Sequence, residues 1–195
     1  MLQRLLLSLI AAGTLALSGC ALSPQQLNPD PQFSGQPVAV GQGQPVVVKV
    51  VDGRQSTELG TRGGLYSETS AVTVRSQDVI PKLQAQAEVA VRLLGFTPSP
   101  NAYNAPTLTL TLADLKYQSP KDGVYVTQAT IGATFRVDVQ SGGRNYSGRY
   151  GSSLDQSFGM APNQATNTKL VSDVLSDALN RVFKDPSIGQ TLNTR

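Results

Sequence analysis

Residues 129–139 read ATIGATFRVDV, and their side chains alternate strictly between two kinds. The odd positions are apolar and the even positions are small, polar or charged, which is the pattern of a strand that buries one face. Gly142-Gly143 follows, and paired glycines favour a two-residue hairpin turn. The stretch therefore predicts a β-hairpin whose second strand extends to about Phe158.

The turn also predicts the register of the hairpin. If Ser141 faces Arg144, the numbers of paired residues add up to 285. One face then pairs only apolar or aromatic residues: Val139 with Tyr146, Phe135 with Tyr150, and Ile131 with Leu154. The other face pairs Gly132 with Ser153, Thr134 with Gly151, and Arg136 with Arg149. A slip of one residue would destroy this match, so we expect a single register.

Similar patterns on both sides of the hairpin predict the remaining elements. They are strands at 46–51, 71–75 and 107–117, a helix at about 76–94 that ends before Gly95, and a second helix to about Phe183 that Asn163 or Asn167 caps. The residues between 55 and 70 are polar and glycine-rich, which predicts a long loop. The expected order is β-β-α-β-β-β-α, typical of an α+β two-layer sandwich with two helices on one face of a mainly antiparallel sheet.

The N-terminal residues have the pattern of an export signal. Arg4 precedes an apolar run from Leu5 to Leu17, which is too short to span a bilayer as a helix. Leu17-Ser18-Gly19-Cys20 resembles a bacterial lipobox. That resemblance implies that residues 1–19 are removed and that Cys20 carries a thioether-linked diacylglycerol and an N-acyl chain such as palmitate. The alternative is an ordinary secreted protein with a leftover thiol, but an unpaired cysteine in an exported chain favours a chemical use for it.

The mature chain is expected to have three parts. Residues 20–44 contain the lipidated cysteine and a Pro-, Gln- and Gly-rich stretch, which predicts a disordered tether. Residues 45–188 form a single domain, and residues 189–195 are polar and predict a loose tail. No internal repeat is evident.

Composition excludes several classes of function. The chain has no histidine, and Cys20 is its only cysteine. Ser-His-Asp and Cys-His catalysis are therefore excluded, as is any zinc site built on His or Cys. Without Arg4, fifteen Lys and Arg face thirteen Asp and Glu, and no basic cluster indicates nucleic-acid binding. We expect no cofactor, no metal and no nucleic-acid partner.

The order and spacing of several short motifs resemble the YajG-type family of bacterial outer-membrane lipoproteins. These motifs are the lipobox, the turn at Asp52 and Arg54, the helix exit from Arg92 to Phe96, Leu112-x-x-Leu115-x-Tyr117, Tyr146-x-x-x-Tyr150, Asn163-x-x-x-Asn167, and Asp185-x-x-Ile188. The resemblance covers nearly all of residues 45–188. It implies an acylated, periplasm-facing protein, and it supplies no established catalytic or ligand-binding residues. By resemblance to sorted lipoproteins, Ala21 after the cysteine implies transfer to the outer membrane.

The favoured function is a non-enzymatic accessory protein of the cell envelope that binds another envelope component. If the helices cover the face that carries Phe135, the opposite face is a flat strip of small residues with Arg136 and Arg149 as candidate anchors for an acidic or extended partner. Like charges across a strand pair are unfavourable by up to about 1 kcal/mol. Asp138, diagonal to Arg149, would offset this on an ordinary solvated face. The loop at 55–70 is the alternative binding surface.

Two other functions remain open. Tyr66, Tyr103, Tyr117 and Tyr125 could stack on the sugars of the cell wall, which would make the protein a glycan binder. Alternatively, Asp52 with Glu58, Glu68 or Asp78 could form the carboxylate pair of an envelope hydrolase, which needs two carboxyl groups about 5–10 Å apart. Turn and cap chemistry explains these acidic residues equally well, so we expect no enzymatic activity.

The lipobox yields the first prediction. Each buried methylene of an acyl chain contributes about 0.8 kcal/mol to membrane binding, so several chains make release negligible. A Cys20→Ser protein should therefore leave the membrane fraction or accumulate unprocessed when cells are fractionated. If the variant is cleaved and still sediments with membranes, the anchor lies elsewhere.

Overall fold

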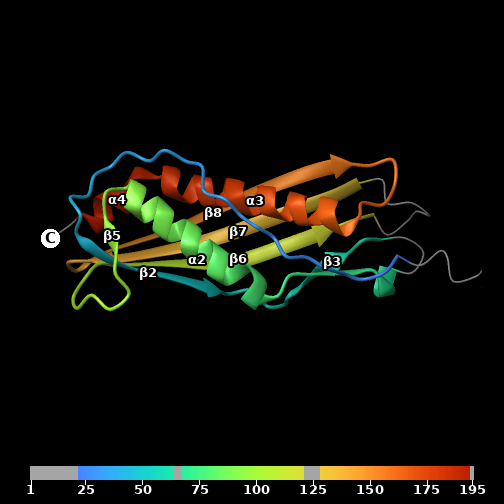
Figure 1. Ribbon diagram of the computed structural model, residues 1–195, viewed down its shortest axis with the longest axis horizontal. Coiled ribbons are helices and arrows are strands. Elements are labelled where there is room, and N and C mark those ends of the chain that lie inside the picture. The colour runs from blue at the N-terminus through green and yellow to red at the C-terminus, as the bar shows by residue number, and fades with distance from the viewer. Residues whose placement is uncertain (1–21, 64–66, 121–127, 194–195) are drawn as a thin grey trace, which may run out of the picture.

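A computed structural model describes residues 22–63, 67–120 and 128–193 (Figure 1). Residues 1–19, which are expected to be a signal peptide, lie outside the described residues, as do Cys20, Ala21, Tyr66 and Tyr125.

The main sheet has five strands in the order β5-β2-β6-β7-β8. Their bounds are Thr97–Pro98 for β5, Pro45–Asp52 for β2, Thr107–Gln118 for β6, Gln128–Ser141 for β7 and Arg144–Ser157 for β8. β2 is parallel to both of its neighbours, whereas β6, β7 and β8 are antiparallel. The sheet is thus mixed, but its longest ladders, β6–β7 and β7–β8, are antiparallel, so the expectation of a mainly antiparallel sheet is confirmed.

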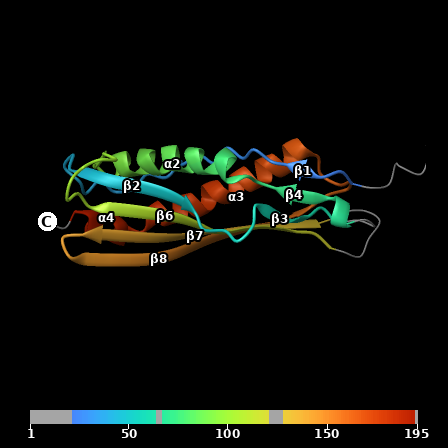
Figure 2. The same ribbon diagram turned by 90° about the horizontal axis from the view of Figure 1, so that it is seen from below.

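The helices form the second layer. α2 (Ser76–Leu93) packs on β2, α3 (Gln164–Lys184) packs on β7 and β8, and the short α4 (Pro186–Leu192) contacts the same two strands. Figure 2 shows α2 on one side of the strands, with β7 and β8 on the other side of the molecule. The expected α+β two-layer sandwich is therefore confirmed.

The register of the β7–β8 hairpin is confirmed. Ser141 pairs with Arg144, and Phe135 pairs with Tyr150. Gly142 and Gly143 have φ angles of 52° and 79°, which a type I′ turn requires at both central positions. The odd-numbered residues of β7 are buried under the helices, so the alternation seen in the sequence separates core from surface.

A second, smaller sheet includes the expected strand at 71–75, and one of its other strands lies in the region expected to be a long loop. β1 (Gln25–Gln26), β4 (Ala71–Thr73) and β3 (Glu58–Thr61) lie in the order β1-β4-β3, and a short 3-10 helix, η2 (Ser67–Thr69), precedes β4. β1 is parallel to β4, and β3 is antiparallel to it. Figure 1 shows this sheet at the end of the molecule opposite the C-terminus.

The N-terminal strap, defined here as residues 22–44, corrects the expectation of a disordered tether. Leu27 is fully buried in the core, and its backbone N–H donates to the Thr73 carbonyl at 2.8 Å. Near its other end, the N–H groups of Val40 and Gly41 both donate to the Leu94 carbonyl at the end of α2. The strap is therefore part of the folded domain, and Figure 1 shows it in blue along the helices.

The middle of the strap is held by polar side chains of α3 spaced four residues apart. The hydroxyls of Ser172 and Ser176 accept from the N–H groups of Asp30 and Gln32 at 2.9 and 2.8 Å. Asn180 Oδ1 accepts from the backbone N–H groups of Ser34 and Gly35, each at 3.0 Å. A spacing of four puts the three side chains on one helix face, where they satisfy the backbone of an extended chain.

The expected loose tail is also corrected over residues 189–192. Asp185 ends α3 and caps α4, because its Oδ1 accepts from the Ser187 N–H at 2.8 Å and Pro186 follows at the first helical position. Ile188 and Leu192 are buried. The C-terminal residues therefore add to the core.

The buried strap predicts a stability effect that a free tether would not have. Leu27→Ala should lower the free energy of unfolding by about 2–5 kcal/mol, the usual loss for a fully buried leucine. Val38→Ala is the matched control, since Val38 lies in the same strap but is 80% exposed and should change little. Urea denaturation measures both, and equal stability of the two variants would contradict a docked strap.

Candidate functional site

The outer sheet face is the face of the main sheet turned away from α2 and α3. Cross-strand pairing puts Val51, Thr111, Arg136 and Arg149 in one row across β2, β6, β7 and β8. The adjacent row is Lys49, Thr109, Asp138 and Ser147. Lys49, Arg136 and Arg149 are all exposed. The structure thus brings the two predicted anchor residues together, with a third cation nearby.

Asp138 neutralises only one of the two opposed arginines. Arg136 Nε lies 3.1 Å from Asp138 Oδ2, and the other carboxylate oxygen accepts from the Ser147 hydroxyl at 2.6 Å. We expected Asp138 to offset the charge of Arg149, its diagonal neighbour, but Asp138 pairs with Arg136 instead. Within the described parts of the chain, Arg149 has no hydrogen bond or ion pair, so its guanidinium is available to a partner.

Arg149 also borders a hollow of about 410 Å³ beneath the segment that follows β2. Gln55, Ser56 and Glu58 line it from that segment, and Lys116 lines it from β6. The two alternative binding surfaces of the sequence analysis, the 55–70 region and the outer sheet face, therefore adjoin at Arg149. They form one continuous surface.

The edge of the sheet beside Arg149 is also open. β8 is the terminal strand, and no described strand pairs with its outer side. Since Ser141 and Arg144 close the hairpin as a hydrogen-bonded pair, the odd-numbered residues of β8 point their backbone N–H and C=O groups away from β7. β8 contains no proline, lysine or bulge of the kind that usually protects an edge. It is a template for a further strand.

The acidic residues considered for catalysis are distributed among structural roles. Asp52 accepts from Arg54 Nε at 2.8 Å and from the Ser76 hydroxyl at 2.5 Å. Burial alone would raise the pKa of Asp52, but hydrogen bonds from Arg54 and Ser76 outweigh it and lower the pKa to about 2. Asp78 pairs with Arg75 at 2.8 Å, as expected near a helix start. Glu58 lies in the hollow beside Arg149, and Glu68 lies in η2.

Of the tyrosines considered for sugar stacking, the two that the structure describes, Tyr103 and Tyr117, differ completely in exposure. Tyr117 is only 1% exposed and donates to Asn167 Oδ1 at 3.2 Å, so it cannot present a ring to a sugar. This bond gives Asn167 a core role, whereas Asn163 is the residue that caps α3, through the Thr166 N–H. Tyr103 is 92% exposed in the loop before β6.

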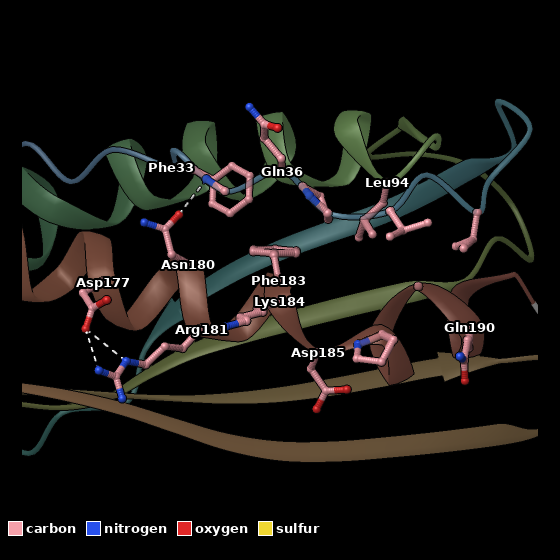
Figure 3. Close-up of a pocket in the computed structure, with 16 residues that line it drawn as sticks. Phe33, Gln36, Leu94, Asp177, Asn180, Arg181, Phe183, Lys184, Asp185 and Gln190 are labelled. Carbon is pink, nitrogen blue, oxygen red and sulfur yellow. Dashed lines mark hydrogen bonds and ion pairs between the residues drawn. The ribbon is translucent and has the colours of Figure 1, made fainter.

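A larger hollow of about 840 Å³ lies between the strap and the junction of α3 with α4 (Figure 3). Phe33 of the strap meets Phe183 of α3 edge to face at 5.5 Å between ring centres. Figure 3 shows Asp177 and Arg181 at one end of the hollow and Asp185 near its base. No sequence pattern predicted this hollow, because six of its sixteen lining residues belong to the strap.

Beside this hollow, Asp185 ties β8 to the helix junction. The Tyr146 and Tyr150 hydroxyls donate to its Oδ2 at 2.8 and 2.7 Å. Gly148 lies between the two tyrosines, and a Cβ there would come within 2.6 Å of the Tyr150 hydroxyl, so only glycine lets both rings converge. Burial raises the pKa of Tyr150, while for Asp185 the tyrosine bonds outweigh burial and lower the pKa to about 2. The carboxylate stays ionised as a structural acceptor.

The described residues show neither a metal-binding cluster nor a membrane-spanning helix. Within residues 22–63, 67–120 and 128–193, no three acidic or cysteine side chains lie close enough together to hold a metal ion. No helix in the same ranges combines the length and the hydropathy needed to span a bilayer.

Several solved structures of bacterial proteins resemble the chain weakly. A minor lipoprotein from Acinetobacter baumannii has 10% identity and a TM-score of 0.45, over 75% of this chain and 91% of that one. A protein of the DUF330 family from Xanthomonas campestris has 13% identity and a TM-score of 0.46, over 88% and 95%. The PelC dodecamer from Paraburkholderia phytofirmans has 18% identity and a TM-score of 0.32, over 76% and 94%. TM-scores below 0.5 are too low to indicate a shared function or assembly.

Comparison of the sequence with known proteins identifies a family but no individual curated relative. No curated protein matches the chain. Residues 31–193, by contrast, match a family described as uncharacterized lipoprotein, and this range includes the end of the strap, the main sheet, β3 and β4 of the smaller sheet, α2, α3 and α4. Because the match spans most of the chain, the protein belongs to this lipoprotein family.

Proposed function

We propose that the protein is a non-enzymatic accessory lipoprotein of the bacterial cell envelope that binds an acidic, extended segment of another envelope protein. The binding surface is the outer sheet face at the β8 edge, with Arg149 as the main anchor and Arg136 as the second. The observation that carries the proposal is the exposed, unpaired guanidinium of Arg149 beside an open strand edge.

The chemistry of this surface selects the partner. An extended segment added to β8 would gain backbone hydrogen bonds along a fourteen-residue strand, the usual source of affinity in strand addition. Arg149 and Lys49 project from the outer face and favour carboxylates over cations, since like charges placed together cost several kcal/mol. In the adjoining hollow, Lys116 is paired with Asp114 at 2.7 Å and Arg54 with Asp52 at 2.6 Å, so Arg149 is the cation that this hollow offers to a partner. An acidic extended segment suits both the backbone edge and these cations.

The non-enzymatic part of the proposal rests on the state of the candidate carboxylates. Asp52 and Asp78 are each committed to an arginine, and Asp52 is held ionised well below neutral pH. A glycosidase needs one carboxyl group that keeps its proton near neutral pH.

The anchor is proposed to be the lipid on Cys20, and the destination to be the outer membrane. The lipobox and the lipoprotein family support the first proposal. Ala21 and the motifs shared with the YajG-type family support the second.

The proposed destination leads to a prediction for cell fractionation. On a sucrose gradient, the wild-type protein should comigrate with the outer membrane, and Ala21→Asp should shift it toward the inner membrane by supplying a retention residue. Ala21→Ser is the matched control and should not shift it. Wild-type protein in the inner-membrane fraction would contradict the proposed sorting.

The anchor residues lead to a prediction for partner capture. In-cell crosslinking of the Arg136→Glu, Arg149→Glu double variant should lose the captured partner, while the melting profile stays near wild type. The variant keeps a like-charge pair across the strands, and it replaces the exposed ion pair with Asp138 by a repulsion between carboxylates on the solvated face, each of which amounts to about 1 kcal/mol or less. Of the single variants, Arg149→Glu should reduce capture more, because Arg136 is already engaged by Asp138.

The matched control is the Arg92→Glu, Lys169→Glu double variant, which changes net charge equally on the helix layer at two exposed residues that also hold ion pairs. It should capture the partner normally. Loss of capture in both double variants would indicate a general charge effect, and unchanged capture in the first would rule out the outer sheet face.

A further inference from the structure

The fold begins very close to the residue that is proposed to carry the lipid. The Ser23 carbonyl accepts from Arg62 Nη1 at 3.1 Å, and two residues later Gln25 begins β1 and pairs with Val72. Ser23 is 23 − 20 = 3 residues after Cys20. Three residues of extended chain span roughly 11 Å at most. The domain therefore cannot move far from the lipid while the strap is docked.

Arg62 links this starting point to the loop between β8 and α3. The Arg62 side chain is buried, with the residue only 6% exposed, and its Nη2 donates to the Pro162 carbonyl at 2.9 Å. Ser23 and Pro162 thus meet on the same guanidinium, although they are 139 residues apart in the sequence. The β8–α3 loop must lie beside the N-terminal end of the strap.

This loop carries an exposed apolar side chain. Met160, two residues before Pro162, is 78% exposed. Methionine is flexible and adapts to irregular apolar surroundings. Its side chain lies outside the core, at the end of the molecule where the chain leads to Cys20.

We propose that this end of the domain rests on the lipid surface, with Met160 entering the interface between headgroups and acyl chains beside the Cys20 anchor. The proposal rests on the lipidation of Cys20 set out above. The occupant of the surface around Met160 is the membrane itself, because the three-residue link keeps Ser23 within roughly 11 Å of the anchor and Arg62 joins Ser23 to the loop that carries Met160.

The opposite end of the molecule provides an internal comparison. Tyr103 is even more exposed than Met160 and lies in the loop before β6, near the Gly142-Gly143 turn, since Thr107 pairs with Gln140. β6 has twelve residues, so the two ends of this strand are roughly 36 Å apart. Figures 1 and 2 both show β1 and the start of α3 at the end opposite the marked C-terminus. The two exposed side chains therefore report on opposite ends.

The experiment uses full-length, lipidated protein with one introduced cysteine, Met160→Cys or Tyr103→Cys. Each is labelled with an environment-sensitive fluorophore, since a thioether at Cys20 leaves the new thiol as the only reactive one. The protein is reconstituted into phosphatidylethanolamine and phosphatidylglycerol vesicles with and without a nitroxide-labelled lipid. We expect the label at 160 to be quenched several-fold more strongly than the label at 103, and to shift its emission to the blue.

Flotation of the same vesicles separates the two proposals. Protein that does not float with the vesicles has no lipid anchor, which would overturn both the proposed function and this inference. Protein that floats but shows equal quenching at the two sites, or stronger quenching at 103, would overturn only the orientation.

Discussion

The parity of the β7–β8 hairpin is the constraint on which the rest of the structure depends. The turn at Gly142-Gly143 holds Ser141 opposite Arg144, and every later pair follows from that one. Odd residues of β7 then face α3, and even residues face outward. A slip of one residue would turn Arg136 into the core, where an unpaired charge is very unfavourable. The same parity creates the row of Arg136 and Arg149 on the outer sheet face, so core and candidate site are two results of one register.

The hairpin was predictable because its information is local and periodic. The strap was not, because the residues that bind it lie elsewhere in the sequence. Ser172, Ser176 and Asn180 hold its backbone, and in the α3 sequence they appear only as polar positions of an amphipathic helix. Leu27 is a single buried residue without a periodic neighbour. The tail did contain a signal in Asp185-Pro186, since aspartate is a preferred N-cap and proline is favoured at the first helical position.

The candidate site was predictable in part for the same reason. Pairing in the hairpin correctly brought Arg136 opposite Arg149, but it could not show which arginine Asp138 neutralises. Residues two apart on one strand share a face, and Arg136 reaches Asp138 along its own strand. The hollow beside Arg149 depends on how the segment after β2 lies over the sheet, which no local pattern specifies. Tyr117 is an aromatic residue of the kind that stacks on sugars, but it is buried in the core.

The strap also determines how far the domain can act from the membrane. Docked, it leaves a link of three residues and holds the domain within roughly 11 Å of its anchor. Between β1 and Val40, its backbone is held mainly by single hydrogen bonds to the side chains of α3, and a pull on the N-terminus loads such bonds one at a time. Peeling the strap back to Gln44 would lengthen the link to 44 − 20 = 24 residues, or roughly 80 Å. The link between lipid and domain is therefore short while the strap is docked and long once tension has undocked it.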